Sequence, residues 1–407
     1  MFDEKNYGFN LGTQQVKIST GKIARQAGGS VIVQCGGTVL LVTATRSKDV
    51  KEGQDFFPLT VDYIEKFYAS GKFPGGFIKR ESKPSTEEIL ISRLVDRPIR
   101  PLFPEGFLNA VHIVITVISY DEVNQPENLA TIGVSVALGL SDIPFAGTVA
   151  GVTVGYIDGE YILNPTPEQL EVSEIELSVA GTKDAVTMVE AGAKEVSEDV
   201  MLEAIMFGHE RIKEICAEQD KFLTQFEVVK YEFEKQETNA EVKEFIDGFA
   251  GELETAIMTP GKLEKYEAID NLEIELFDKY IAKLEEENRE IEEDLEKVFK
   301  KYYRDLEKRT VRDAILYKKY RTDGRTTTEI RPLDVEIDTL PVPHGSALFT
   351  RGETQALVVA TLGSKADEQI VDGMEDESRK KFFLHYNFPP YSVGEAGFMR
   401  APGRREL

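Results

Sequence analysis

GSVIVQCGGTVLLVTAT, residues 29–45, and GSALFTRGETQALVVAT, residues 345–361, align without a gap. Both stretches are rich in β-branched and other apolar residues and are bounded by glycines, as is typical of β-strands. The identical pairs, all at one fixed offset, are Gly29/Gly345, Ser30/Ser346, Gly36/Gly352, Thr38/Thr354, Leu41/Leu357, Val42/Val358, Ala44/Ala360 and Thr45/Thr361. Two later blocks keep the same order: FF at Phe56 recurs at Phe382, and KRE at residues 79–81 is echoed by RRE at residues 404–406. The preserved order predicts a duplicated domain.

The stretches around the first copy mix strand and helix signals. AVHIVITVISY, residues 110–120, predicts a strand, and Asp158-Gly159 between two apolar arms predicts a hairpin. ATIGVSVALGLSDIPF, residues 130–145, predicts a buried helix that ends near Pro144, and Ser197 predicts the N-cap of a helix that runs to about Cys216. Strands and helices without regular βαβ spacing indicate an α+β fold.

A Glu/Lys-rich segment separates the two copies from about Thr238 onward. Its apolar positions recur at helical spacings and predict an amphipathic helical insert, at Ile281, Leu284, Ile291, Leu295, Val298, Tyr302 and Leu306. Its charges are interpreted as a solvated face. We therefore expect a first core at 1–235, an all-helical domain at 236–320 and the N-terminal part of a second core at 321–407. In the first copy a helix is predicted to begin near Ser85, where Ser85 and Glu88 can form a capping box. The second copy stops at Leu407, where the matching helix would begin, so we expect it to be incomplete.

The overall charge limits the class of protein. The chain has 407 residues, a formal net charge of -24 and a pI near 4.8. Long-range repulsion argues against a protein that coats nucleic acid or an anionic membrane with its whole surface. Cys35 and Cys216 fit neither a disulfide framework nor a zinc site, and no long apolar run or leader is evident. We expect a cytoplasmic protein without a membrane partner.

Common catalytic motifs are missing from the sequence. No phosphate-binding loop, dinucleotide fingerprint, nucleophile elbow or zinc-protease helix occurs. The four histidines are scattered and are interpreted as structural or surface residues, with His385 of interest because it falls near the second basic loop.

One basic cluster stands out against the acidic total. In PGGFIKRE, residues 74–81, glycine backbone can approach a ligand closely, Phe77 offers a face for base stacking, and Lys79 and Arg80 can meet phosphates. The following helix and the second copy add further candidate phosphate contacts, at Arg93, Arg97, Arg100, Arg400, Arg404 and Arg405. The alternative is that Arg93 and Arg97 pair with carboxylates such as Asp96 or Glu88 within the fold. The presence of a related basic loop in each copy favours the interpretation that both loops bind one polyanion.

Several blocks together resemble the bacterial polynucleotide phosphorylase family: KFPGGFIKRE, RLVDRPIRPLFP, RTDGR, IRPLD, LFTRGETQ and HYNFPPYSVGEAGFMRAPGRRE. The resemblance covers nearly the whole chain. It implies two RNase PH-like cores, of the ribosomal protein S5 domain 2-like arrangement, around an all-helical insert. It also implies a homotrimeric ring that threads single-stranded RNA, degradosome partners, and processive 3'-to-5' phosphorolysis with inorganic phosphate and Mg²⁺ or Mn²⁺.

The resemblance also assigns roles. Phe77 matches the aromatic that narrows the pore, Lys79 and Arg80 match its basic neighbours, and the six arginines match positions that contact RNA. Ile78 departs from the family, which often has Phe there, and Lys79 stands where Arg is common. The family's phosphate-binding serines and metal-binding aspartates lie further along, so we expect no catalytic or metal residue in this chain. A non-catalytic RNA-binding ring scaffold is the alternative; a small-molecule kinase on a related fold would need a phosphate loop that the sequence lacks.

Overall fold

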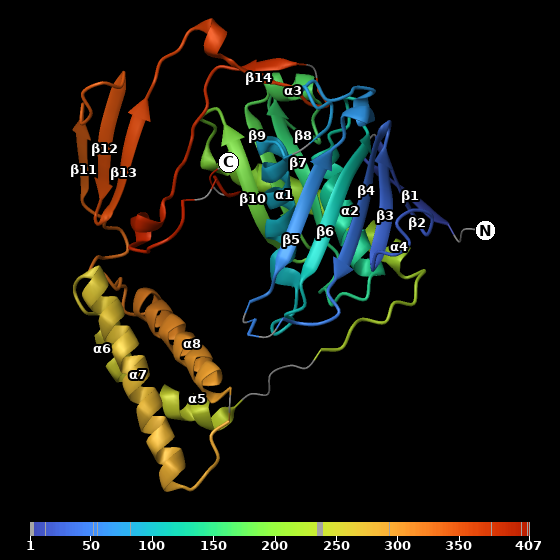
Figure 1. Ribbon diagram of the computed structural model, residues 1–407. Helices are drawn as coiled ribbons and strands as arrows, with labels where there is room; N and C mark the ends of the chain where they lie inside the picture. The colour runs from blue at the N-terminus through green and yellow to red at the C-terminus, as the bar shows by residue number, and fades with distance from the viewer. Residues whose placement is uncertain are drawn as a thin grey trace. The chain divides into compact units, whose positions relative to one another are not determined.

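A computed structural model describes residues 4–12, 14–51, 53–54, 56–81, 83–233, 239–292, 294–375, 377–399, 401–404 and 406 (Figure 1). The chain forms two compact units, one of residues 1–235 with 365–407 and one of residues 236–364. These units group residues that contact one another in space. The predicted boundaries instead separate the two copies of the core and the insert, and they stay predictions.

The first unit contains a six-stranded sheet of order β1-β2-β3-β4-β6-β5. Its strands are β1 (Lys5–Leu11), β2 (Gln14–Thr20), β3 (Gly29–Cys35), β4 (Thr38–Arg46), β5 (Leu59–Glu65) and β6 (Val111–Ser119). All neighbours are antiparallel except β5 and β6. Residues 29–45 form the β3–β4 hairpin, in which Cys35 pairs with Thr38 and Gly36 takes a φ of 56°.

A second, antiparallel sheet of the same unit has the order β10-β9-β7-β8. Its strands are β7 (Ala150–Ile157), β8 (Glu160–Leu163), β9 (Ile175–Gly181) and β10 (Val186–Ala193). The predicted hairpin at Asp158-Gly159 is confirmed, since it joins β7 to β8 with positive φ at both residues. Positive φ at both central positions is typical of a type I′ turn, whose backbone twist matches that of the two strands.

Four helices complete this unit: α1 (Thr86–Ile99), α2 (Pro126–Leu140), α3 (Pro167–Val172) and α4 (Glu198–Leu223). Helix α2 contacts β3, β4 and β7 and is therefore buried between the two sheets (Figure 1). The prediction of its bounds was wrong by about one turn at each end, because Pro126 starts the helix and Ser141 ends it. Helix α4 continues past the predicted end at Cys216, because Gln219 and Phe222 extend its buried face.

Helix α1 stabilises the edge of the six-stranded sheet. Its predicted capping box is confirmed: the Ser85 hydroxyl accepts from the Glu88 N–H at 3.1 Å, and Glu88 accepts from the Ser85 N–H. Glu88 also accepts from the Glu65 N–H at 2.7 Å, and Ser92 accepts from the Tyr63 N–H at 2.9 Å. Polar side chains of α1 therefore satisfy backbone groups of the edge strand β5.

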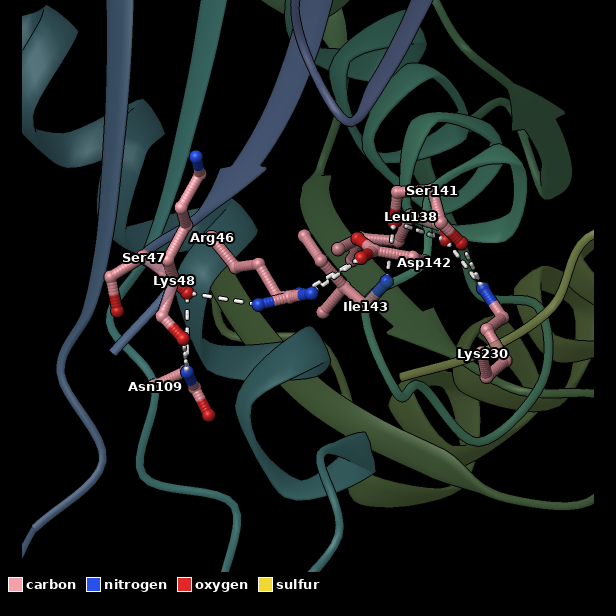
Figure 2. A network of polar contacts seen from close by, with 9 residues as sticks. All are labelled: Arg46, Ser47, Lys48, Asn109, Leu138, Ser141, Asp142, Ile143 and Lys230. Atoms are coloured by element: carbon pink, nitrogen blue, oxygen red, sulfur yellow. Dashed lines mark hydrogen bonds and ion pairs between the residues drawn. The ribbon is translucent and has the colours of Figure 1, made fainter. Parts of the chain in front are cut away.

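A polar network joins the end of β4 to the end of α2 (Figure 2). The Arg46 guanidinium donates to Asp142 at 2.7 Å and lies 3.8 Å from the Tyr231 ring centroid. The Lys230 ammonium donates to three carbonyl oxygens at the C-terminus of α2, those of Leu138, Gly139 and Ser141. Burial lowers the pKa of Lys230. The cation satisfies carbonyl groups that a helix end leaves without partners.

The second unit contains the helices α5 (Ala240–Asp247), α6 (Ala250–Ile257), α7 (Lys262–Glu286) and α8 (Leu295–Leu316), with a core of their own. The predicted amphipathic pattern fails at Ile291, which lies in the connection between α7 and α8 and is exposed. Phe299 and Tyr303 are fully buried, in place of the predicted Val298 and Tyr302. The buried face of α8 includes Leu295, Phe299, Tyr303 and Leu306, so the predicted positions Leu295 and Leu306 are confirmed. Among the described residues, no helix has the length and apolar character needed to cross a membrane.

The second copy repeats the first in detail. Strands β11 (Leu333–Ile337), β12 (Gly345–Arg351) and β13 (Thr354–Ala360) form a sheet in which Gly345 pairs with Ala360, as Gly29 pairs with Ala44. Further along, the short helix η4 (Pro390–Val393) ends at Gly394 with a φ of 76°, and η1 (Phe67–Ser70) ends at Gly71 with a φ of 72°. The backbone therefore supports the duplication over two separate blocks.

Burial differs between the copies. Val42 is 0% exposed beneath α2, whereas its counterpart Val358 is 52% exposed. In the described part of the second copy no helix follows the hairpin in the position of α2. The same local sequence therefore gives the same hairpin with or without a covering helix.

Candidate nucleic-acid interface

The segment Phe73–Arg80, here called the aromatic loop, presents apolar rings to solvent. Phe77 is fully exposed, and Phe73 and Ile78 are also largely exposed. The Lys79 N–H donates to the Gly76 carbonyl at 3.1 Å, and Lys79 has a positive φ of 54°. A tight turn with an unfavourable backbone conformation at Lys79 thus places Phe77 at its tip. An exposed cluster of this kind is typical of a binding surface.

The two basic residues of the loop behave differently. The Lys79 ammonium donates to the Gly75 carbonyl at 3.1 Å and lies 5.3 Å from the Phe73 ring centroid. It is therefore bonded within the loop. Arg80 is exposed and makes no hydrogen bond or ion pair with any residue that the structure describes. Its guanidinium has all its donors available for a phosphate.

The three arginines of the α1 region all reach solvent. Arg93 has no ion-pair partner among the described residues, whereas Arg97 pairs with Glu190 of β10. Arg100, in the short helix η2 (Arg100–Leu102), pairs with Asp96 at 2.7 Å and donates to the Leu59 carbonyl at 3.2 Å. The alternative of internal pairing therefore applies to Arg97, through Glu190, and not to Arg93. Surface ion pairs are weak, so the paired guanidinium groups remain accessible to a polyanion.

The second-copy arginines are described only at Arg404; Arg400 and Arg405 lie outside the described residues. Arg404 forms an ion pair with Asp62 and donates to the Val61 carbonyl at 3.1 Å, both on the edge strand β5. Nε2 of His112 lies 2.8 Å from Asp62. Partial burial acts to raise the pKa of Asp62, but hydrogen bonds from His112 and Arg404 outweigh it and lower that pKa.

Sequence reasoning missed this pairing. Asp62 lies on β5, where it alternates with the buried Val61 and Tyr63, so its outward direction was predictable. Its partner was not, because Arg404 is 342 residues away. His385 has a ring centroid 5.6 Å from that of Phe383, and no contact with Arg404 is seen among the described residues.

A group of carboxyl groups was also missed at the junction of β5, α1 and α2. Burial raises the pKa of Glu65 to about 8, and the charge of Glu87 adds to this effect. Burial likewise raises the pKa of Glu127 to about 7, with contributions from Glu87 and Glu375. Within the described chain, no three His, Cys, Asp or Glu side chains have an arrangement that could hold a metal ion.

An open cleft of about 400 Å³ lies beside the β3–β4 turn, lined by Gln14, Gln15, Lys17, Gln34, Cys35, Gly36, Val123 and Asn124. Burial and the charge of Asp121 raise the pKa of the Cys35 thiol. A protonated thiol is a poor nucleophile, and no histidine lines the cleft. This arrangement therefore lacks a nucleophile with its base.

Family models match almost the whole chain. A model described as "3' exoribonuclease family, domain 1" matches residues 12–144 and again 329–407, which confirms the duplicated core. A "domain 2" model of that family matches residues 147–211. A model described as "Polyribonucleotide nucleotidyltransferase, RNA binding domain" matches residues 237–326, the helical insert.

Curated relatives agree with these matches. The polyribonucleotide nucleotidyltransferase of Geobacter sulfurreducens is 49% identical over 99% of the chain, and that of Staphylococcus carnosus is 49% identical over 100% of it. The chain spans 57% of the length of each of these relatives.

A solved structure described as "archaeoglobus fulgidus exosome with RNA bound to the active site" aligns over 55% of this chain and 89% of its own. The identity is 18% and the TM-score is 0.41. The superposition is too loose for that protein's properties to be transferred to this chain.

Proposed function

Because the chain belongs to the 3' exoribonuclease family and corresponds to the N-terminal portion of bacterial polyribonucleotide nucleotidyltransferases, we propose that it forms the RNA-holding part of a phosphate-dependent 3'-to-5' exoribonuclease. In the whole protein, an oxygen of inorganic phosphate attacks the phosphorus of the terminal phosphodiester. The bond to the 3' oxygen of the preceding nucleotide breaks, and a nucleoside diphosphate leaves. The reverse reaction extends RNA from nucleoside diphosphates.

One observation carries the RNA-holding role: Phe77 is fully exposed at the tip of a tight turn, and the guanidinium of the nearby Arg80 has no partner among the described residues. A base can stack on the ring while the guanidinium meets a phosphate. Such contacts are tolerant of sequence, as a processive exonuclease needs. Arg93, Arg97 and Arg100 extend the same proposal along α1, and Arg400, Arg404 and Arg405 extend it to the second copy.

In the whole protein, groups further along the second core would hold magnesium or manganese and the attacking phosphate. No step of the reaction is attributed to this chain's described carboxylates. The metal would stabilise charge on the transferring phosphoryl group. A homotrimeric ring, degradosome partners and a cytoplasmic location complete the proposal. Two buried, unpaired cysteines are in keeping with that location.

The proposed reaction is tested by incubating the full-length protein with poly(A), phosphate and magnesium and measuring ADP. We expect ADP release that depends on phosphate. A second reaction without phosphate is the control for simple hydrolysis.

The 407-residue chain is assayed in parallel. We expect it to bind poly(A) without forming ADP. ADP from this chain would mean that the catalytic groups lie within it, while folded full-length protein that binds RNA but yields no ADP would favour the scaffold alternative.

A further inference from the structure

The hairpin formed by β14 (Gln369–Val371) and β15 (Ser378–Lys380) reaches the base of the aromatic loop. Residues Asp372–Glu375 of its turn, here called the clip, belong to the same compact unit as that loop. Lys72 and Met374 are 302 positions apart in the sequence and yet in direct contact. A segment of the second copy therefore meets the candidate RNA-contacting loop of the first copy.

Several contacts hold the clip in place. The Lys72 ammonium donates to the carbonyl oxygens of Met374, at 3.1 Å, and Glu375, at 2.9 Å. The Tyr120 hydroxyl donates to Glu375 at 3.2 Å. Met374 is only 4% exposed and packs in the core of the first unit. Burial of an apolar side chain between polar contacts gives the clip a defined position.

The clip also bonds directly to the loop. The Gly75 N–H donates to Oδ2 of Asp372 at 3.2 Å. A Cβ added at position 75 would lie 2.3 Å from that carboxylate oxygen, so the Asp372 side chain would have to move away to admit one. Because carboxylates accept strongly from backbone N–H groups, this contact restrains the loop at Gly75.

The restraint continues to the tip of the loop. The Gly75 carbonyl accepts from the Lys79 ammonium at 3.1 Å, and the Gly76 carbonyl accepts from the Lys79 N–H. Phe77 lies within this turn, and its own side chain is fully exposed. These hydrogen bonds therefore link Asp372, through the backbone of Gly75, to the turn that carries Phe77.

We propose that Asp372 and Lys72 are positioning residues, through which the clip of the second copy sets the presentation of Phe77 to RNA. The inference rests on the proposed function in naming RNA as the ligand. The contact between clip and loop can be tested without RNA.

The absence of tryptophan from the chain permits a direct test. In the full chain carrying Phe77→Trp, the single indole reports the mobility of the loop by fluorescence anisotropy. Adding Asp372→Ala should lower the anisotropy, because Gly75 loses its acceptor. Asp372→Asn keeps an acceptor oxygen, so its anisotropy should be close to that of the protein with Asp372 intact. Glu377→Ala is the matched control, because Glu377 is exposed in the same turn and forms no hydrogen bond or ion pair with a residue that the structure describes.

Unchanged anisotropy in folded Asp372→Ala protein would overturn the proposal. Lys72→Met provides a second, independent variant, and it should lower the anisotropy as well. Circular dichroism of each variant establishes that the protein is folded. If Asp372→Ala unfolds the chain, the result for Lys72→Met decides.

A titration with poly(A) then tests whether the loop binds RNA, independently of the contact between clip and loop. Quenching of the indole by stacked bases should give an affinity about fivefold weaker in the Asp372→Ala variant, the loss expected for one positioning hydrogen bond. Lower anisotropy with no quenching in any variant would support the clip and contradict the RNA-binding role of the loop. Quenching with equal affinity in all variants would overturn the positioning role.

Discussion

Arg93 and Arg97 are four residues apart on one helix, yet they differ in ion pairing. Arg97 pairs with Glu190, and Arg93 has no partner within the described chain. A charge without a carboxylate partner binds a phosphate with no competing ion pair to break. At the scale of single residues, Arg80 and Arg93, which have no carboxylate partner among the described residues, should therefore contribute most to RNA affinity.

Replacing Arg93 by Gln should weaken poly(A) binding and make it less dependent on salt. One lost phosphate contact reduces the slope of log affinity against log salt by about 0.7 for single strands. The measurement is a salt series of binding titrations. Arg211→Gln is the matched control, because Arg211 is partly exposed on α4 and already pairs with Glu214 at 2.6 Å. Equal slopes for wild type and Arg93→Gln would remove Arg93 from the interface.

At the scale of elements, the junction of β5, α1 and α2 brings several carboxyl groups close together. Glu65 lies at the end of β5, accepts from the Tyr63 hydroxyl at 3.1 Å, and has a pKa raised to about 8 by burial and by Glu87. The folded protein thus binds the Glu65 proton more tightly than the unfolded chain does. Its contribution to stability is complete below the ordinary pKa near 4.5 and is lost as the pH rises through about 8.

Glu65→Gln should therefore flatten the pH dependence of unfolding. Wild type should lose stability between about pH 5 and about pH 8.5, and the variant should lose less, because glutamine keeps an acceptor for Tyr63 without titrating. Urea denaturation at both pH values measures the difference. Glu160→Gln, an exposed position on β8, is the control. Parallel pH profiles for all three proteins would contradict the assignment.

At the scale of the whole molecule, the two compact units have separate hydrophobic cores. Helices α5 to α8 of the second unit, here called the helical unit, bury Leu276, Tyr280, Phe299 and Tyr303, while the sheets of the first unit share another cluster with α2. Separate cores allow separate local unfolding, because loss of packing in one does not expose the other.

Phe299→Ala should destabilise the helical unit by about 3–5 kcal/mol through the cavity that it leaves. Hydrogen exchange followed by mass spectrometry should then show faster exchange in α5 to α8, with exchange in β3, β4 and β6 unchanged. Ile113→Ala, in the sheet core, should give the opposite pattern. Equal acceleration in both units after Phe299→Ala would show that they unfold together.

The sequence by itself determined the duplicated hairpin, the helical insert, the capping box at Ser85 and the turn at Asp158-Gly159. Each of these features depends on the local spacing of residue types or on the backbone conformation of one short turn. The duplication is visible as identical residues at a fixed offset, so it can be recognised from the sequence alone. It also identified Phe77 and the arginines as candidates, through the spacing of glycine, aromatic and basic residues.

Only the tertiary structure decided which of these arginines form ion pairs among the described residues and which residue restrains the aromatic loop. Arg97 meets Glu190, Arg404 meets Asp62, and Gly75 meets Asp372, across separations of 93 to 342 residues. It also decided burial, since Val42 lies beneath α2 and Val358 does not. Pairing and burial depend on which distant segments the fold brings into contact, and a local pattern carries no information about those partners.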